Sequence, residues 1–123
     1  GPVYAMTPIM ARQKLHLDDI DTFEINEAFA AQVIACNRAF ANDKFCKEEL
    51  GLKEAFGLIN LDRLNPDGGA ISIGHPIGAS GARIVLHALK TLQHSKKKRA
   101  MTSICIGGGQ GGAMYIERVD GGK

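Results

Sequence analysis

The sequence has few of the features that mark membrane-spanning, secreted or nucleic-acid-binding proteins. No apolar run approaches the roughly 18 residues that cross a bilayer, and no cleavable presequence is visible. The chain has only three cysteines, Cys36, Cys46 and Cys105. An odd number without zinc spacing favours a reducing compartment over a disulfide scaffold. The net charge is only +2, which is too small to indicate a nucleic-acid partner.

Metal-binding patterns are also lacking. His87 and His94 lie on one face of a predicted helix but have no third ligand near them in the sequence, so no zinc site is predicted. The acidic run around Asp18 and Asp21 lacks the glycine and the spacing of a calcium loop. We therefore expect a metal-free protein.

The most informative stretch is Cys-Ile-Gly-Gly-Gly-Gln-Gly-Gly at 105–112. It puts a thiol beside backbone that a ligand can approach closely, because glycine has no side chain. The run contains the glycine spacing of a dinucleotide-binding loop, but such a loop needs a helix after it, and residues 114–119 alternate like a β-strand. The sequence therefore predicts a strand at 101–106, a glycine loop and a second strand.

A second glycine-rich segment, Gly-His-Pro-Ile-Gly-Ala-Ser-Gly at 74–81, lies where a helix is predicted to begin. From Gly78 to about Ser95, apolar residues recur every three or four positions, as in an amphipathic helix: Ala82, Val85, Ala88, Leu89 and Leu92. The amino end of a helix favours an anion or a developing oxyanion and keeps a nearby imidazole neutral. His75 is therefore predicted to be a hydrogen-bond donor or a base.

A third segment, Asn-Glu-Ala-Phe-Ala at 26–30, follows a predicted strand at 22–25. Residues 27–40 are apolar on nearly every face, which predicts a helix that is buried on all sides. Asn26 is predicted to be the N-cap of this helix. An amide in such a dry place can hold a water or a carbonyl oxygen.

In this order, the three segments resemble the carboxy-terminal motifs of thiolases, the acetyl-CoA acyltransferases. The resemblance runs from Gly1 to about Arg118, with residues 2–15 similar to the helix that leads into the strand before the asparagine motif. In the family the nucleophilic cysteine lies in an amino-terminal domain, to which no segment here corresponds. The resemblance thus predicts one partial carboxy-terminal domain at 1–123, without its first strand. Because that strand is central in the family's sheet, it also predicts a gap in the sheet.

The resemblance also implies roles for individual residues. Cys105 would be the acid/base that takes a proton from the acetyl donor in condensation and supplies one to the leaving enolate in thiolysis. His75 would activate the absent nucleophile and, with a water held by Asn26, form an oxyanion hole. The backbone N–H of Gly107 would serve a second oxyanion hole. Two further residues would line the site near the pantetheine and the acyl group: Ala28 and Phe29.

The predicted architecture is a layered α/β half-domain with a mixed sheet and helices on both faces. Its order is helix, strand, buried helix, insertion, short strand at 70–73, helix and a terminal antiparallel pair. In the family, two such halves stack helix to helix and the subunits form homodimers or homotetramers. Without the amino-terminal half, we expect Ala28, Phe29, Ile34 and the Gly78/Gly81 face to be partly uncovered, so that the chain alone associates or is poorly soluble.

The resemblance implies 3-ketoacyl-CoA thiolysis or acetyl-CoA condensation, with coenzyme A and acyl-CoA as substrates and no permanently bound cofactor. The segment 41–64 is longer than in compact biosynthetic thiolases, which favours fatty-acid degradation by β-oxidation, whereas Asn26 favours a free-standing enzyme. A module that binds acyl-CoA or lipid without catalysis and a chain-building condensing enzyme are the alternatives, and Cys105 argues against the second. We expect a cytoplasmic protein, or a mitochondrial or peroxisomal one in a eukaryote.

Overall fold

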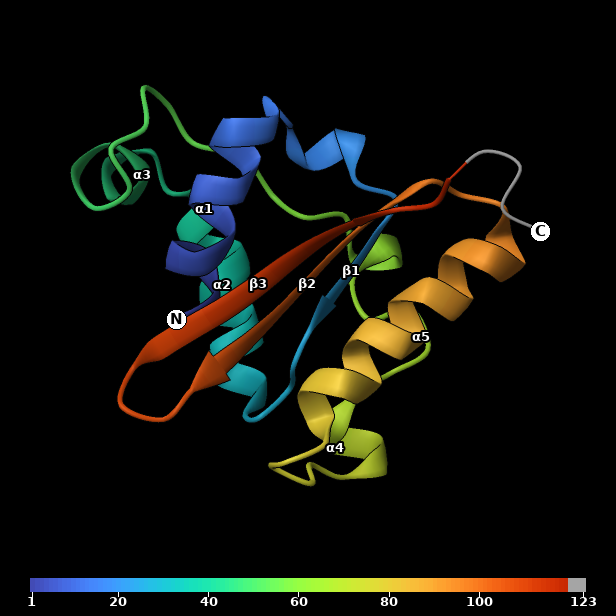
Figure 1. Ribbon diagram of the computed structural model, residues 1–123. Helices are drawn as coiled ribbons and strands as arrows, with labels where there is room; N and C mark the ends of the chain where they lie inside the picture. The colour runs from blue at the N-terminus through green and yellow to red at the C-terminus, as the bar shows by residue number, and fades with distance from the viewer. Residues whose placement is uncertain (120–123) are drawn as a thin grey trace.

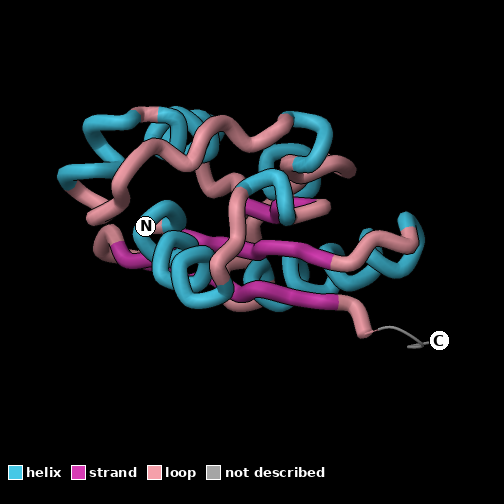
Figure 2. The backbone as a smooth tube through the Cα atoms, turned by 90° about the horizontal axis from the view of Figure 1, so that it is seen from above, coloured by secondary structure: helices cyan, strands magenta, loops and turns pink. Residues whose placement is uncertain are grey.

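A three-stranded mixed sheet forms the centre of the computed structural model, which describes residues 1–119 (Figure 1). Its strands are β1 (Thr22–Ile25), β2 (Arg99–Ile106) and β3 (Gln110–Glu117). The sheet order is β1-β2-β3, with β1 parallel and β3 antiparallel to β2. Figure 2 shows the three strands side by side, with the short β1 at one edge. The predicted mixed sheet and its terminal antiparallel pair are confirmed.

Helices lie on both faces of this sheet. Successive residues of a strand point to opposite faces, and Met101 of β2 packs with α1 (Pro2–Gln13) whereas Ala100 packs with α5 (Ser80–Ser95). Helix α1 therefore covers one face and α5 the other (Figure 1). The remaining helical segments are α2 (Ala30–Ala41), α3 (Asp43–Glu48), α4 (Ala70–Ile73) and the short 3₁₀ turns Leu17–Asp19 and Leu61–Arg63.

The ends of the two long helices follow from the sequence. Helix α1 begins with Pro2, whose ring fixes a helical φ and whose missing N–H is not needed in the first turn. It ends at Lys14 in the left-handed conformation, and α5 ends in the same way at Lys96. The predicted helices at 2–15 and from Gly78 to about Ser95 are thus confirmed, with α5 beginning at Ser80.

Strands β1 and β2 pair directly, contrary to the gap that the resemblance implied. Thr22 lies opposite Ala100 and Ile25 opposite Ser103, as in an ordinary parallel ladder. On its other edge β1 makes one parallel bridge, between Phe23 and Leu64. The sheet closes because each backbone N–H and C=O along β1 requires a hydrogen-bond partner, and β2 supplies partners on that edge.

Residues 70–73 form one helical turn, so the predicted short strand is wrong. Ile71 and Ile73 are both exposed and so form no buried strand face. The backbone N–H groups of Ser72 and Ile73 instead donate to the carbonyl of Gly69. The carboxylate of Glu27 accepts a hydrogen bond from the N–H of Ile71, which stabilises the start of the turn.

Helix α2 also differs from its prediction. It begins at Ala30 with Phe29 at the N-cap position, so Asn26 caps no helix. Within α2 only Cys36 and Phe40 are buried, because the described residues cover only one side of the helix. Burial on all sides is therefore wrong, whereas the expected exposure at Ile34 and Phe29 is confirmed, with Phe29 75% exposed.

Residues 1–119 contain no helix that is long and apolar enough to cross a membrane.

Candidate functional site

Two of the candidate residues, Asn26 and Cys105, lie at one edge of the sheet. Strands β1 and β2 are parallel, so their carboxyl ends meet at the same edge, which is where open α/β sheets bind ligands. Asn26 follows the last residue of β1 directly, and Cys105 is the penultimate residue of β2. His75 lies in the loop between α4 and α5. Figure 1 shows this loop at the lower end of the molecule, the end toward which the arrows of β1 and β2 point.

Asn26 is held through its backbone and not through its side chain. Its N–H donates to the carbonyl of Ser103 at 2.9 Å. The residue is 2% exposed, yet neither Oδ1 nor Nδ2 of its side chain has a hydrogen-bond partner within the described residues. A buried amide without partners is costly, and nearly all such groups in folded proteins are paired. The side chain is therefore free to bind a polar atom of a ligand or a water.

Cys105 is the most accessible of the three cysteines, since Cys36 and Cys46 are buried. Its Sγ donates to Oε1 of Gln32 in α2 at 3.4 Å, so the thiol lies on the α1 and α2 side of the sheet. Burial is the main cause that raises the pKa of the Cys36 thiol. Cys36 is thus an unreactive core residue, in contrast to the half-buried Cys105.

The loop after Cys105 needs its glycines. Gly108 and Gly109 have φ values of +81° and +80°, which residues other than glycine rarely adopt. Gly107 does not have a positive φ and faces open space. A ligand can therefore approach the backbone at Gly107 without contacting a side chain.

His75 is exposed, but its ring is held by a buried residue. Nδ1 lies 2.6 Å from the hydroxyl of Ser80, the fully buried first residue of α5. A hydroxyl can donate to Nδ1 or accept from it. In the first case Nε2 carries a proton and donates, whereas in the second Nε2 is unprotonated and accepts. The contact with Ser80 therefore supports either a donor or a base at the exposed nitrogen.

No hydrogen bond among the described residues joins Asn26, His75 and Cys105 to one another. Each of the two titratable residues is bonded to a neighbour on its own side of the sheet: Cys105 to Gln32 and His75 to Ser80. Near them, Ala28 is half-buried and Phe29 exposed.

A polar cluster on the α5 face of the sheet consists of Glu24, His87 and Asp67. The buried carboxylate of Glu24 is 2.6 Å from Nδ1 of His87, and Nε2 of His87 is 2.9 Å from Asp67. Burial raises the pKa of Glu24, and His87 only partly offsets this. Burial alone would lower the pKa of His87, but its hydrogen bonds and attraction to Glu24 and Asp67 prevail and raise it. Residues 1–119 bring no three His, Cys, Asp or Glu side chains into a metal-binding group.

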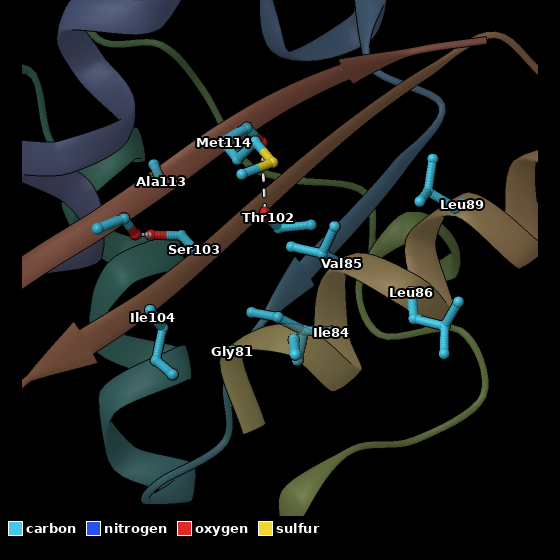
Figure 3. Close-up of a pocket in the computed structure, with 12 residues that line it drawn as sticks. Gly81, Ile84, Val85, Leu86, Leu89, Thr102, Ser103, Ile104, Ala113 and Met114 are labelled. Atoms are coloured by element: carbon cyan, nitrogen blue, oxygen red, sulfur yellow. Dashed lines mark hydrogen bonds between the residues drawn. The ribbon is translucent and has the colours of Figure 1, made fainter. Parts of the chain in front are cut away.

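An apolar groove of about 560 Å³ separates α5 from strands β2 and β3 (Figure 3). Leu86 and Leu89 of α5 are 57% and 46% exposed, and Met114 of β3 is also exposed. The apolar stripe predicted for this helix is buried only at Ala88 and Leu92. Its other members turn toward the groove or solvent, and the structure buries Ile84 in their place.

Comparisons with known proteins show the family to which the chain belongs. A family model described as the thiolase C-terminal domain matches residues 1–118. The chain therefore belongs to the thiolase family, and the resemblance seen in the sequence is confirmed. The crystal structure of human mitochondrial 3-ketoacyl-CoA thiolase in complex with CoA is similar to it with a TM-score of 0.78 and 39% identity, covering 97% of this chain and 26% of that one.

Two curated relatives have similar sequences. A probable 3-ketoacyl-CoA thiolase of Caenorhabditis elegans is 42% identical over 117 residues, which cover 95% of this chain and 26% of the relative. A beta-ketoadipyl-CoA thiolase of Acinetobacter baylyi is 47% identical over 119 residues, or 97% of this chain and 26% of the relative. The chain thus spans about a quarter of the length of the relatives that it matches.

Several residues at the site were not predicted. Ser80 lies within the His75 segment and could have been noticed as a small polar residue five positions after the histidine. Gln32 gives no signal, because its relation to Cys105 depends on how α2 packs against the sheet. Asn65 precedes a proline and reads as an ordinary turn residue, yet it bonds to both neighbours of Asn26.

Proposed function

We propose that this chain is the carboxy-terminal catalytic half of a thiolase, which transfers acyl groups between coenzyme A and an enzyme cysteine. The reaction is 3-ketoacyl-CoA thiolysis or its reverse, acetyl-CoA condensation. The observation that carries the proposal is that, in a thiolase-family domain, Asn26 and Cys105 lie at the carboxyl ends of two adjacent parallel strands, with His75 in the loop before α5. The similar human enzyme was crystallised with CoA, in agreement with coenzyme A and acyl-CoA as substrates.

Cys105 is assigned as the acid/base. In condensation its thiolate takes a proton from the methyl group of the acetyl donor, and in thiolysis its thiol returns a proton to the enolate that leaves. Its accessibility relative to Cys36 and Cys46 supports this assignment. Proton transfer by a positioned side chain contributes about 10²- to 10⁴-fold to a rate.

His75, Asn26 and Gly107 are assigned to the charge that develops on oxygen. With Nδ1 held by Ser80, Nε2 of His75 donates to the enolate oxygen in one tautomer and activates the nucleophilic cysteine in the other. The unpaired amide of Asn26 would fix a water in the same oxyanion hole, and the N–H of Gly107 would serve a second one. Losing one such donor typically costs about 2.7–4 kcal/mol of barrier.

The groove along α5 is the surface that we assign to the rest of the enzyme. An amino-terminal thiolase domain, carrying the nucleophilic cysteine, would cover Leu86, Leu89 and Met114, which are exposed here. Ala28 and Phe29 would then line the site for pantetheine and the acyl group. The assembled enzyme would be a homodimer or homotetramer of the cytoplasm, or of the mitochondrion or peroxisome in a eukaryote.

A chimera tests the proposal. The corresponding carboxy-terminal segment of the Acinetobacter beta-ketoadipyl-CoA thiolase is replaced by residues 1–118 of this chain, and thiolysis of beta-ketoadipyl-CoA is measured. We expect activity that falls at least 100-fold on Cys105→Ser, whereas Cys46→Ser, at a buried cysteine away from the edge, retains it. A folded chimera that binds CoA but has no thiolysis would instead favour the non-catalytic binding module.

A further inference from the structure

Asn65 makes an unusual set of contacts around Asn26. It lies in the connection between the 3₁₀ turn Leu61–Arg63 and α4, and has a left-handed φ of +45°. Its backbone N–H donates to the carbonyl of Phe23 at 2.8 Å. Its Oδ1 accepts from the N–H of Ile25 and its Nδ2 donates to the carbonyl of Ile25, both at 2.9 Å. The amide of Asn65 thus replaces a neighbouring strand at the free edge of β1.

The same Nδ2 also donates to Glu27 at 2.9 Å. Asn65 therefore binds the residue before Asn26 and the residue after it, while the N–H of Asn26 itself is held by Ser103 on β2. With its backbone fixed on both edges, the buried side chain of Asn26 is held in place although it has no hydrogen bond of its own.

Glu27 extends this network to the segment that carries His75. Its other carboxylate oxygen accepts from the N–H of Ile71 at 3.2 Å. A Cβ at Gly69 would lie 2.8 Å from Cδ of Glu27, so a side chain there would have to displace the carboxylate. Ile71 belongs to α4 and precedes His75 by four residues, with Ser72, Ile73 and Gly74 between them. One chain of hydrogen bonds, Asn65 to Glu27 to Ile71, thus joins the two candidate segments.

We propose that Asn65 and Glu27 form a positioning pair that sets the Asn26 amide relative to His75 in the thiolase reaction. This inference rests on the proposed function and adds to it two residues that touch no reacting atom. Their role is geometric: the donor on Asn65 and the acceptor on Glu27 fix one spacing between the end of β1 and the turn before His75. A misplaced oxyanion donor loses much of its effect.

The test reverses the donor and the acceptor. Asn65→Asp keeps nearly the same shape and tolerates a positive φ, but replaces the donor by a carboxylate that faces Glu27 and the carbonyl of Ile25. Adding Glu27→Gln restores a donor opposite an acceptor. In the chimera we expect Asn65→Asp to lower kcat at least tenfold with KM changed less than threefold, and the double variant to recover at least threefold of kcat.

Asn60→Asp is the matched control. Asn60 is an exposed asparagine five residues earlier, and its Oδ1 accepts from the N–H of Asp62, a contact that aspartate can also make. This variant should leave kcat and KM unchanged. The proposal would be overturned if Asn60→Asp lowered kcat as much as Asn65→Asp, or if adding Glu27→Gln did not raise the kcat of Asn65→Asp. A general loss of stability would not be reversed by exchanging the donor and the acceptor. If Asn65→Asp prevents folding, Glu27→Gln alone should lower kcat with KM unchanged, and native kcat in that variant would overturn the proposal.

Hydrogen exchange in the chain itself separates this inference from the proposed function. The Asn65→Asp substitution should accelerate exchange of the Ile71 amide at least tenfold, with partial recovery in the double variant and no change in Asn60→Asp. Unchanged exchange at Ile71 would overturn the link between the two segments. If the unsubstituted chimera folds but has no thiolysis, the proposed function is overturned, and with it the catalytic part of this inference. Altered exchange in the Asn65→Asp chain would still support the hydrogen-bond link between the two segments.

Discussion

The two faces of the sheet differ in how completely this chain covers them. On the α1 face, Met6, Met10, Phe23, Ile25 and Met101 are all but fully buried in one continuous core. On the α5 face, the buried hydrophobic cluster among residues 1–119 is much smaller and comprises Ala88, Leu92 and Ala100. Beside that small core lies the open groove in Figure 3. The α1 face therefore holds the fold together, whereas the α5 face keeps apolar surface available for a partner.

The candidate site draws on both faces. Cys105 is bonded to α2 on the well-packed side, whereas His75 is bonded to the start of α5, the helix on the open side. Groups on a rigid core keep their positions alone, while groups on a loosely covered helix depend on what packs against it. We therefore expect the His75 side of the site to be completed by the same surface that fills the groove.

The largest expected difference between the faces is in stability. Phe40 is fully buried in the α1-side core and packs edge to face against Phe56, so Phe40→Ala should lower the free energy of unfolding by about 3–5 kcal/mol. Leu89→Ala removes a similar apolar side chain from the groove and should cost less than about 1 kcal/mol. Urea unfolding of the two variants measures both values. Similar losses would mean that the α5 face is as well packed as the α1 face.

A smaller effect is expected on self-association, which the exposed groove favours. Replacing Leu86 and Leu89 together by lysine should weaken association of the isolated chain at least tenfold, or about 1.4 kcal/mol, in sedimentation equilibrium. The matched control replaces Leu58 and Leu61, which are also exposed but lie outside the groove. If the control pair weakens association as much, the groove is not the contact surface.

The sequence was sufficient for elements whose local pattern agrees with their final environment. Strand β1 was predicted with its exact bounds, and α5 and the hairpin of β2 and β3 within a few residues. In each case the local sequence pattern agrees with the structure that forms. The three motif segments were likewise found in advance, because their residues are consecutive in the chain.

Predictions failed where the outcome depends on a distant contact. The turn at α4 forms where Glu27, 44 residues away, accepts from Ile71, and no local pattern reveals this. Asn26 has the residue type of an N-cap, but Phe29, in an extended conformation, occupies that position because α2 begins at Ala30. The direct pairing of β1 with β2 and the role of Asn65 also depend on tertiary hydrogen bonds, which neither spacing nor composition specifies.

The smallest expected effect is a pH dependence confined to the α5 face. There, apolar packing is supplemented by the bond between Glu24 on β1 and His87 on α5, with Asp67 on the other ring nitrogen. The pKa of His87 is raised above its ordinary value of 6.5, and that of Glu24 above 4.5. A group whose pKa is higher in the folded state than in the unfolded state stabilises the fold at pH values below its unfolded-state pKa. This contribution is lost as the pH rises through the folded-state pKa. Both groups therefore act in the same direction.

The free energy of unfolding should thus decrease as the pH rises from 5.5 through the folded pKa of His87. Because the His87 side chain is 35% exposed, solvent screening keeps its share below about 1 kcal/mol. His87→Gln should flatten this slope, whereas His94→Gln, on the same helix but outside the bond network, should preserve it. Amide exchange read along the chain should accelerate with pH beyond the intrinsic rate in α5 but not in α1. The same acceleration in α1 would show that the two faces unfold together. Helix α5 would then be held on the sheet no more weakly than α1.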